Sequence, residues 1–175
     1  MSDTPSIHPD ARIGHVHLKV ADLDRALAFY CGVLGFQLTQ RYGRDAAFIS
    51  AGGYHHHIGL NTWESLGGSP PLPGSTGLYH LAILYPTRAE LADALLRLVR
   101  AHISLDGASD HGVSEALYLR DPDNNGVELY WDRPREKWRR NAYNCLSTRP
   151  RDTRYSQSRV PVCTFAPRSS SALSA

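Results

Sequence analysis

The chain between residues 13 and 36 changes its hydrophobic period once. Apolar and polar residues alternate from Val16 to Val20, which predicts a half-buried strand. Apolar residues then recur at helical spacing after Asp22, a residue type that caps helix N-termini, and Gly35 stands where such a helix would end. This segment therefore predicts a strand followed by a helix.

Three short β-like runs, FQLTQRY, AAFIS and YHHHIGLNT, follow this helix, so the first unit reads β-α-β-β-β. After the connector GGSPPLPGSTG the pattern starts again, with alternation from Leu81 to Tyr85 and a helix opened by a capping box from Thr87 to Glu90. EALYLRD, the turn DPDNN and the strand GVELYWD complete the second unit. The sequence predicts two copies of one β-α-β-β-β module.

Two histidines occupy equivalent positions in these copies. His15 lies seven residues before the cap Asp22, and His80 lies seven residues before the cap Thr87. We predict an α+β fold in which two repeated β-α-β-β-β modules pack to form a metal-binding cleft, because a small sheet with one helical face must cover its other face.

The predicted domain spans residues 11–135, with module one at 11–64 and module two at 76–135. Residues 136–175 are Arg- and Ser-rich without sustained periodicity, and we predict a poorly ordered C-terminal tail. A tail docked over the cleft mouth is the alternative.

Composition narrows the class of function. The 175 residues are 42% hydrophobic and 21% charged, which fits a globular domain, and the formal net charge of +2 gives no reason to expect nucleic acid or an acidic membrane surface as a partner. A signal peptide and an apolar segment long enough to span a bilayer are not seen, so we expect a cytoplasmic protein acting on a small molecule. The three cysteines show no CxxC spacing, which argues against a disulfide framework or a thiolate zinc site.

Strand alternation predicts that His15, His80 and Glu128 face the cleft. Two imidazoles and one carboxylate form the facial set typical of non-heme Fe(II) oxygenases. A buried carboxylate also requires a cation or hydrogen bonds, which favours a metal beside Glu128. His17 shares the face of His15 and is a rival ligand, although it lacks the symmetry match to His80.

The triplet in GGYHHHIGL invites a metal site of its own. On a strand, successive side chains point to opposite faces, so His56 would be separated from His55 and His57. We therefore expect that the three do not converge on one ion and that His55 and His57 have no role in the site.

The segments HVHLKVADLDRALAFYCGVLGF and DPDNNGVELYWD resemble the vicinal oxygen chelate superfamily. SDHGVSEALYLRDPDNNGVELY is similar, within it, to type I extradiol ring-cleavage dioxygenases. The resemblance implies an enzyme that cleaves a catechol-type ring with O2 and holds Fe(II), or Mn(II). A homo-oligomer is possible, and the sequence does not predict the oligomeric state. It assigns the metal ligands as His15, His80 and Glu128, and the catalytic residues as His56, His111 and Tyr118.

Three other functions of the same superfamily stay open: a glyoxalase-like isomerase, an epoxide-opening antibiotic-resistance transferase, and a metal-free binding protein. The glyoxalase pattern needs an acid near the end of module one, yet no carboxylate lies between Asp45 and Glu64. The transferase also uses two histidines and one glutamate, so ligand count does not exclude it. His56, His111 and Tyr118 together favour the dioxygenase, and the ring substituents of the catechol are not predicted.

Overall fold

The structure is a computed structural model that describes residues 6–138. Residues 1–5 and 139–175 lie outside this range, so the predicted order of the tail stays a prediction. Arg135–Lys137 form a short 3-10 helix, η2, where that predicted tail begins. Among the described residues, the helices are all too short or too polar to cross a bilayer.

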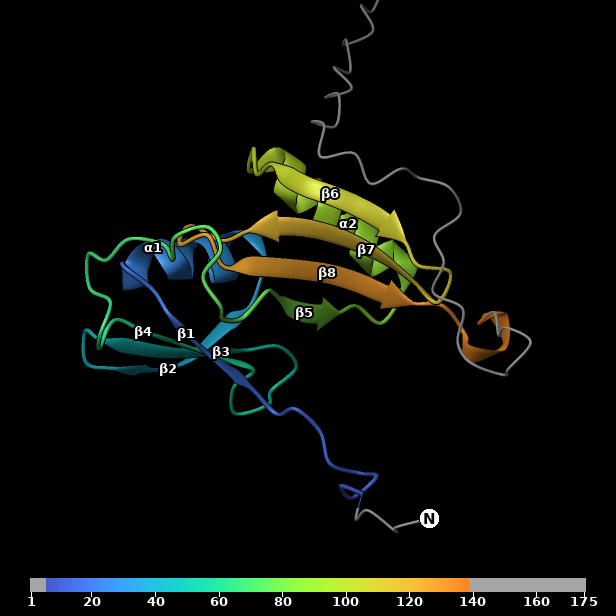
Figure 1. Ribbon diagram of the computed structural model, residues 1–175, viewed down its shortest axis with the longest axis horizontal. Helices are drawn as coiled ribbons and strands as arrows, with labels where there is room; N and C mark the ends of the chain where they lie inside the picture. Colours follow the sequence, from blue (N-terminus) through green and yellow to red (C-terminus); the bar gives the residue numbers. More distant parts are fainter. Residues whose placement is uncertain (1–5, 139–175) are drawn as a thin grey trace, which may run out of the picture.

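Module one contains one four-stranded sheet and one helical segment (Figure 1). The strands follow the spatial order β1-β4-β3-β2, with β1 parallel to β4. The helix α1 continues directly into a π-helical segment, η1. The bounds are β1 Val16–Lys19, α1 Leu23–Leu27, η1 Ala28–Val33, β2 Gln37–Tyr42, β3 Ala46–Ser50 and β4 Ile58–Asn61.

Module two repeats this arrangement with the order β5-β8-β7-β6 and with β5 parallel to β8. Its helix is longer and regular. The bounds are β5 Leu81–Leu84, α2 Arg88–Arg100, β6 Leu105–Asp110, β7 Ser114–Arg120 and β8 Gly126–Asp132. The α+β fold class and the two β-α-β-β-β modules are confirmed.

Both predicted helix starts form as the sequence indicates. The Asp22 side chain accepts a hydrogen bond from the Arg25 backbone N–H at 2.9 Å, and the Thr87 hydroxyl accepts one from the Glu90 N–H at 3.1 Å. These contacts satisfy N–H groups that have no partner within the helix. Gly35 has φ of 88°, a conformation that glycine adopts without a Cβ clash, so the chain leaves the first helix where predicted.

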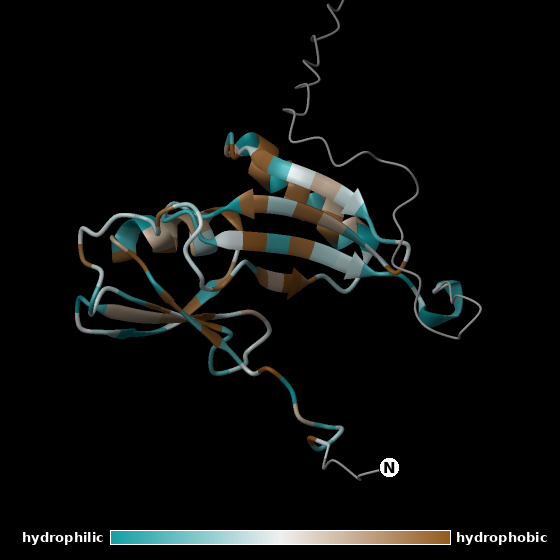
Figure 2. Cartoon of the chain, viewed as in Figure 1, coloured by the Kyte–Doolittle hydropathy of each residue, from teal (hydrophilic) through white to brown (hydrophobic). Residues whose placement is uncertain are grey.

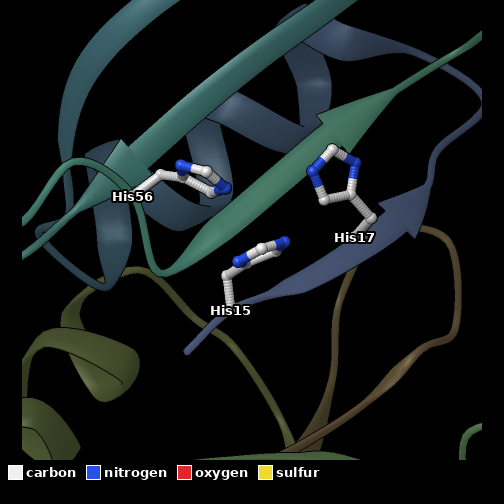
Figure 3. A group of neighbouring side chains, drawn as sticks. All are labelled: His15, His17 and His56. Carbon is white, nitrogen blue, oxygen red and sulfur yellow. The ribbon is translucent and has the colours of Figure 1, made fainter. Parts of the chain in front are cut away.

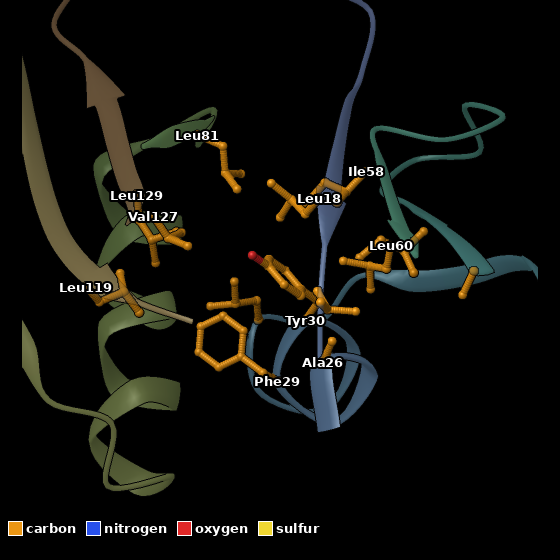
Figure 4. Close-up of a cluster of buried hydrophobic side chains, with 14 of the residues drawn as sticks. Leu18, Ala26, Phe29, Tyr30, Ile58, Leu60, Leu81, Leu119, Val127 and Leu129 are labelled. Atoms are coloured by element: carbon orange, nitrogen blue, oxygen red, sulfur yellow. The ribbon is translucent and has the colours of Figure 1, made fainter. Parts of the chain in front are cut away.

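One hydrophobic core joins the two modules (Figure 4). Leu18 and Leu60 reach it from the first sheet, Val127 and Leu129 reach it from the second, and Phe29 lies between them. Figure 2 shows hydrophobic and hydrophilic residues alternating along β8, as expected for a strand with one face on a core. The core therefore lies on the helix-covered faces of both sheets.

Buried polar contacts also connect the modules. The Tyr30 hydroxyl donates to Asp121 Oδ2 at 2.9 Å, and Arg25 forms an ion pair with Asp123, which also accepts from the Ala21 N–H at 3.0 Å. Burial, followed by the negative charge of Asp121, raises the pKa of Tyr30, so this phenol stays protonated and acts as the donor. The start of the first helix is thus fixed to the turn before β8.

The faces that carry the predicted site residues lie away from the shared core. His15 and His17 are exposed on the outer face of the first sheet. On the outer face of the second sheet, Ala82 is exposed and Leu84 is 53% exposed. We expected these two faces to enclose a common cleft, but within one chain it is the helix-covered faces that meet.

Candidate metal and catalytic site

The two predicted ligands of module two lie in direct contact. His80 immediately precedes β5, which pairs in parallel with β8, where Glu128 lies opposite Ala82. The His80 Nε2 and Glu128 Oε2 atoms are 2.9 Å apart, and the Glu128 side chain is 13% exposed. The Nδ1 atom of His80 is buried without a hydrogen-bond partner among the described residues. An imidazole nitrogen and a carboxylate oxygen therefore converge on one position.

Tyr118 and His111 extend this pair into a chain of hydrogen bonds. Tyr118 is the register partner of Glu128 across β7 and β8, and its hydroxyl donates to Glu128 Oε1 at 3.0 Å. His111 Nε2 lies 2.8 Å from the same hydroxyl. A hydroxyl has a single hydrogen, so the hydrogen shared by His111 and Tyr118 must be carried by the imidazole. The three predicted residues Glu128, Tyr118 and His111 thus form one proton-bearing network.

A cavity of about 310 Å³ opens beside this network. Its walls include His80, His111 and Tyr118, together with Asp106 and Ser109 of β6. Cavities that bind small molecules begin at about this volume, so a single substituted aromatic ring is the appropriate size of ligand. All of its lining residues come from module two.

A second group of imidazoles forms on module one (Figure 3). His15 and His17 leave the same face of the chain at β1, and His56 approaches them from the loop before β4. One ligand atom from each of the three lies within 4.8 Å of the others. Among residues 6–138, this is the one set of three or more His, Cys, Asp or Glu side chains that meets that distance.

The histidine triplet does not lie on a strand. Strand β4 begins at Ile58, so the alternation that we predicted for the triplet does not apply. His55 Nδ1 lies 2.7 Å from His56 Nδ1, which means that His55 contacts the residue from which we expected it to be separated. His57 turns the other way, and its Nδ1 lies 2.9 Å from the Ser50 hydroxyl.

His56 has an environment that favours the neutral imidazole. Burial lowers its pKa, and positive charge on His15 would lower the pKa further. The Nε2 atom of His56 is buried and has no hydrogen-bond partner in the described part of the chain. A neutral imidazole with one uncommitted nitrogen can accept a proton or bind a metal ion.

The structure thus separates the predicted ligands into two groups. His80 lies beside Glu128. His15 lies beside His17 and His56 instead. In the described part of the chain, the ligand atoms of His15, His80 and Glu128 therefore do not all lie within 4.8 Å of one another.

Sequence reasoning missed the aromatic walls of the first group. Phe48 and Trp63 have ring centroids 5.7 and 6.3 Å from that of His17. Phe48 lies on β3 and Trp63 follows β4, so their positions beside His17 depend on how β3 pairs with β4 and on the path of the chain after β4.

Comparison with known proteins shows the family to which the chain is similar. Residues 12–129 match the model of the Glyoxalase/Bleomycin resistance protein/Dioxygenase superfamily. The chain is 47% identical over 137 residues to a catechol-2,3-dioxygenase of Bacillus subtilis, which covers 77% of this chain and 46% of that protein. It is 35% identical over 124 residues to a biphenyl-2,3-diol 1,2-dioxygenase of Rhodococcus globerulus, with 69% of this chain and 63% of that protein covered. The chain therefore spans about half to two thirds of these relatives.

Solved structures share the fold. A lactoylglutathione lyase from Agrobacterium tumefaciens matches with a TM-score of 0.56 and 25% identity, covering 71% of this chain and 96% of that one. A glyoxalase/bleomycin resistance protein/dioxygenase domain from Frankia matches with a TM-score of 0.59 and 26% identity, covering 70% of this chain and 98% of the other.

Proposed function

Because the chain belongs to the Glyoxalase/Bleomycin resistance protein/Dioxygenase superfamily, we propose that it is an extradiol dioxygenase that cleaves a catechol-type ring with O2. The His80–Glu128 contact, together with the hydrogen bonds that run from Glu128 through Tyr118 to His111 beside a cavity of ring size, carries this proposal. The 47% identity to a protein named as a catechol-2,3-dioxygenase supports it. One carbon–carbon bond next to the diol would break, and both oxygen atoms of O2 would enter a hydroxymuconic semialdehyde.

The donor atoms present suit a divalent iron ion. His80 Nε2 and Glu128 Oε2 are 2.9 Å apart, so one ion could be bound by both atoms. We propose that His80, Glu128 and His15 hold Fe(II), with Mn(II) as the alternative, because imidazole and carboxylate ligands suit both ions. When bound, the metal orients the catechol and O2 and lowers the pKa of a catechol hydroxyl.

The position of His15 imposes a condition on this ligand set. His15 lies on the outer face of module one, whereas His80 and Glu128 lie on the outer face of module two. The shared core prevents these two faces of one chain from meeting without breaking Leu18 and Phe29 contacts to module two. We therefore propose a homo-oligomer in which module one of a second copy supplies His15.

The remaining residues would handle protons and orient the substrate. Tyr118 and His111 line the cavity. The Tyr118 hydrogen points to Glu128 and the His111 hydrogen to Tyr118, so the lone pair left on the Tyr118 oxygen would accept a hydrogen bond from a catechol hydroxyl and orient the ring. His56 would approach with His15 and act as the acid–base residue at the reacting oxygen. Its uncommitted Nε2 suits that role.

The test is anaerobic purification with Fe(II), followed by O2 uptake with a series of substituted catechols and detection of a yellow ring-cleavage product. We expect one O2 consumed for each catechol. Full metal loading without O2 uptake on any catechol would contradict the proposal.

A glyoxalase-like isomerase is the second candidate, because the chain is 27% identical over 124 residues to a probable lactoylglutathione lyase of Synechocystis. That reaction, however, would need an acid near the end of module one, and no carboxylate lies between Asp45 and Glu64. Conversion of a hemithioacetal by the metal-loaded protein, without O2 uptake, would favour the isomerase.

A further inference from the structure

We propose that His15, His17 and His56 form a second metal site, of all-imidazole type, that binds a borderline divalent ion such as Zn²⁺ or Cu²⁺. The three rings gather on the outer face of module one (Figure 3). The ring centroids of His15 and His56 are 4.4 Å apart, and those of His15 and His17 are 5.5 Å apart. Their ligand atoms lie within 4.8 Å of one another, so one ion could contact all three after small side-chain rotations.

The orientation of His56 gives a second observation that points to a ligand. Its Nδ1 is engaged by His55 Nδ1 at 2.7 Å, which fixes the ring, while its Nε2 is buried without a partner among the described residues. A buried polar atom without a hydrogen bond destabilises the folded protein. A bound cation would satisfy this nitrogen, and His55 would then play the part of the outer hydrogen-bond partner that metal-binding histidines commonly have.

The strand beside the cluster is shaped to accept the His17 ring. His17 is the register partner of Gly59 on β4, and a Cβ built on Gly59 would collide with the His17 imidazole. The nearest atoms to that Cβ all belong to His17, so the absence of a side chain at position 59 makes room for this ring. The adjoining Trp63 ring stacks on His17 with an interplanar angle of 29°.

The donor set selects the class of ion. Three imidazoles provide nitrogen ligands without negative charge, which suits Zn²⁺ and Cu²⁺ and disfavours Mg²⁺ and Ca²⁺, which prefer oxygen. Three protein ligands also leave a coordination position open, as in zinc sites that bind water or an anion. The site would therefore hold an exchangeable ion together with a small anion or water.

This site overlaps the proposed iron site at His15, but its other two ligands, His17 and His56, differ from His80 and Glu128. The inference does not depend on the proposed function, because the cluster is observed whether or not the chain cleaves catechols. If both proposals hold, an ion bound by the three histidines occupies His15, so that His15 cannot bind iron at the same time. The two ions then compete for His15.

The experiment titrates the metal-free full chain with Zn²⁺, and separately with Cu²⁺, using calorimetry and the Cu²⁺ electron paramagnetic resonance spectrum. Wild-type protein and Glu128→Ala should both bind one ion with nitrogen hyperfine structure, because Glu128 lies outside this cluster. His17→Asn should lose affinity by about 10- to 100-fold or more, as for other changes around metal ligands. Gly59→Ala retains all three histidines but displaces the His17 ring, and it should weaken binding in the same direction.

His57→Asn is the matched control, since His57 neighbours the cluster in sequence but faces Ser50. It should bind as the wild type does. Loss of binding in Glu128→Ala, or unchanged binding in both His17→Asn and Gly59→Ala, would overturn the second site. These results are independent of O2 uptake, so they cannot be confused with failure of the proposed dioxygenase activity.

Discussion

The hydroxyl of Tyr118 donates to Glu128 Oε1 at 3.0 Å from the register position directly opposite on the neighbouring strand. This contact orients the carboxylate, whose other oxygen faces His80. The proposed ligand Glu128 and its hydrogen-bond partner thus lie on one pair of strands, which fixes their geometry more firmly than a loop would.

Changing Tyr118 to Phe should keep the iron and lower the turnover. The substitution removes a hydrogen bond to a charged group and the hydroxyl facing the cavity, and a loss of about 10- to 100-fold is expected from such a bond. Iron content and O2 uptake with catechol are the measurements. If Tyr118→Phe lost its iron as completely as Glu128→Ala, the hydroxyl would be needed for metal binding instead.

Changing His80 to Ala should remove the bound iron. One of the two converging donor atoms disappears, and Glu128 with His15 of the second copy leaves only two of the three proposed ligands. Iron content after anaerobic reconstitution is the measurement, with His102→Asn as the control, because His102 is an exposed histidine with φ of 55°, a conformation that Asn tolerates. A full equivalent of Fe(II) and wild-type turnover in His80→Ala would refute the ligand set.

The three histidines of the triplet should respond differently to substitution by Asn. His56→Asn should retain iron and catechol binding yet turn over about 10²- to 10⁴-fold more slowly, as expected for an acid–base residue. His55→Asn should show a smaller loss, because it only holds the His56 ring, and His57→Asn should match the wild type. Equal rates in all three variants would reduce His56 to a packing residue.

Mixing two inactive variants tests where His15 comes from. If a second copy supplies it, His15→Ala and Glu128→Ala are each inactive, but mixed dimers contain one intact site. Co-expression should then restore about a quarter of the wild-type activity. About half of the two-fold symmetric dimers are mixed, and each mixed dimer has one of its two sites intact. Mixed dimers that are confirmed by mass but remain inactive would place all three ligands in one chain.

The contact between Tyr30 and Asp121 should contribute to stability. Tyr30→Phe leaves the buried carboxylate with one donor fewer, and a hydrogen bond to a charged group contributes about 1.5–3 kcal/mol. Thermal unfolding measures the change, with Tyr42→Phe as the control because Tyr42 is 66% exposed. A shift of the same size in both variants would show that the buried contact adds nothing.

Local chemistry made most of the fold predictable. Asp22, Thr87 and Gly35 act over a few residues of neighbouring chain, so their effects can be inferred without tertiary contacts. The pairing of Glu128 with His80 also followed from alternation, because His80 directly precedes β5 and Glu128 lies on the parallel strand β8.

Other features depend on long-range geometry. The start of β4 at Ile58 is set by pairing with β1 and β3, so the histidine triplet was wrongly assigned to the strand. Which sheet faces meet depends on how Phe29 and Tyr30 pack between the modules. The alternation of apolar and polar residues shows which face of a strand is buried, but it does not show whether that face packs on a helix, on the other module or on a second chain.

The contacts from Tyr30 and Arg25 to the turn before β8 join the two modules, so residues in this junction and residues on the outer faces tolerate substitution differently. Within one chain, a substitution in that junction disturbs both modules at once, whereas a substitution on either outer face affects one module. Imidazoles and carboxylates on the outer faces could therefore be exchanged while the junction keeps the two modules folded. One scaffold could acquire different reactions in this way, without a new fold for each.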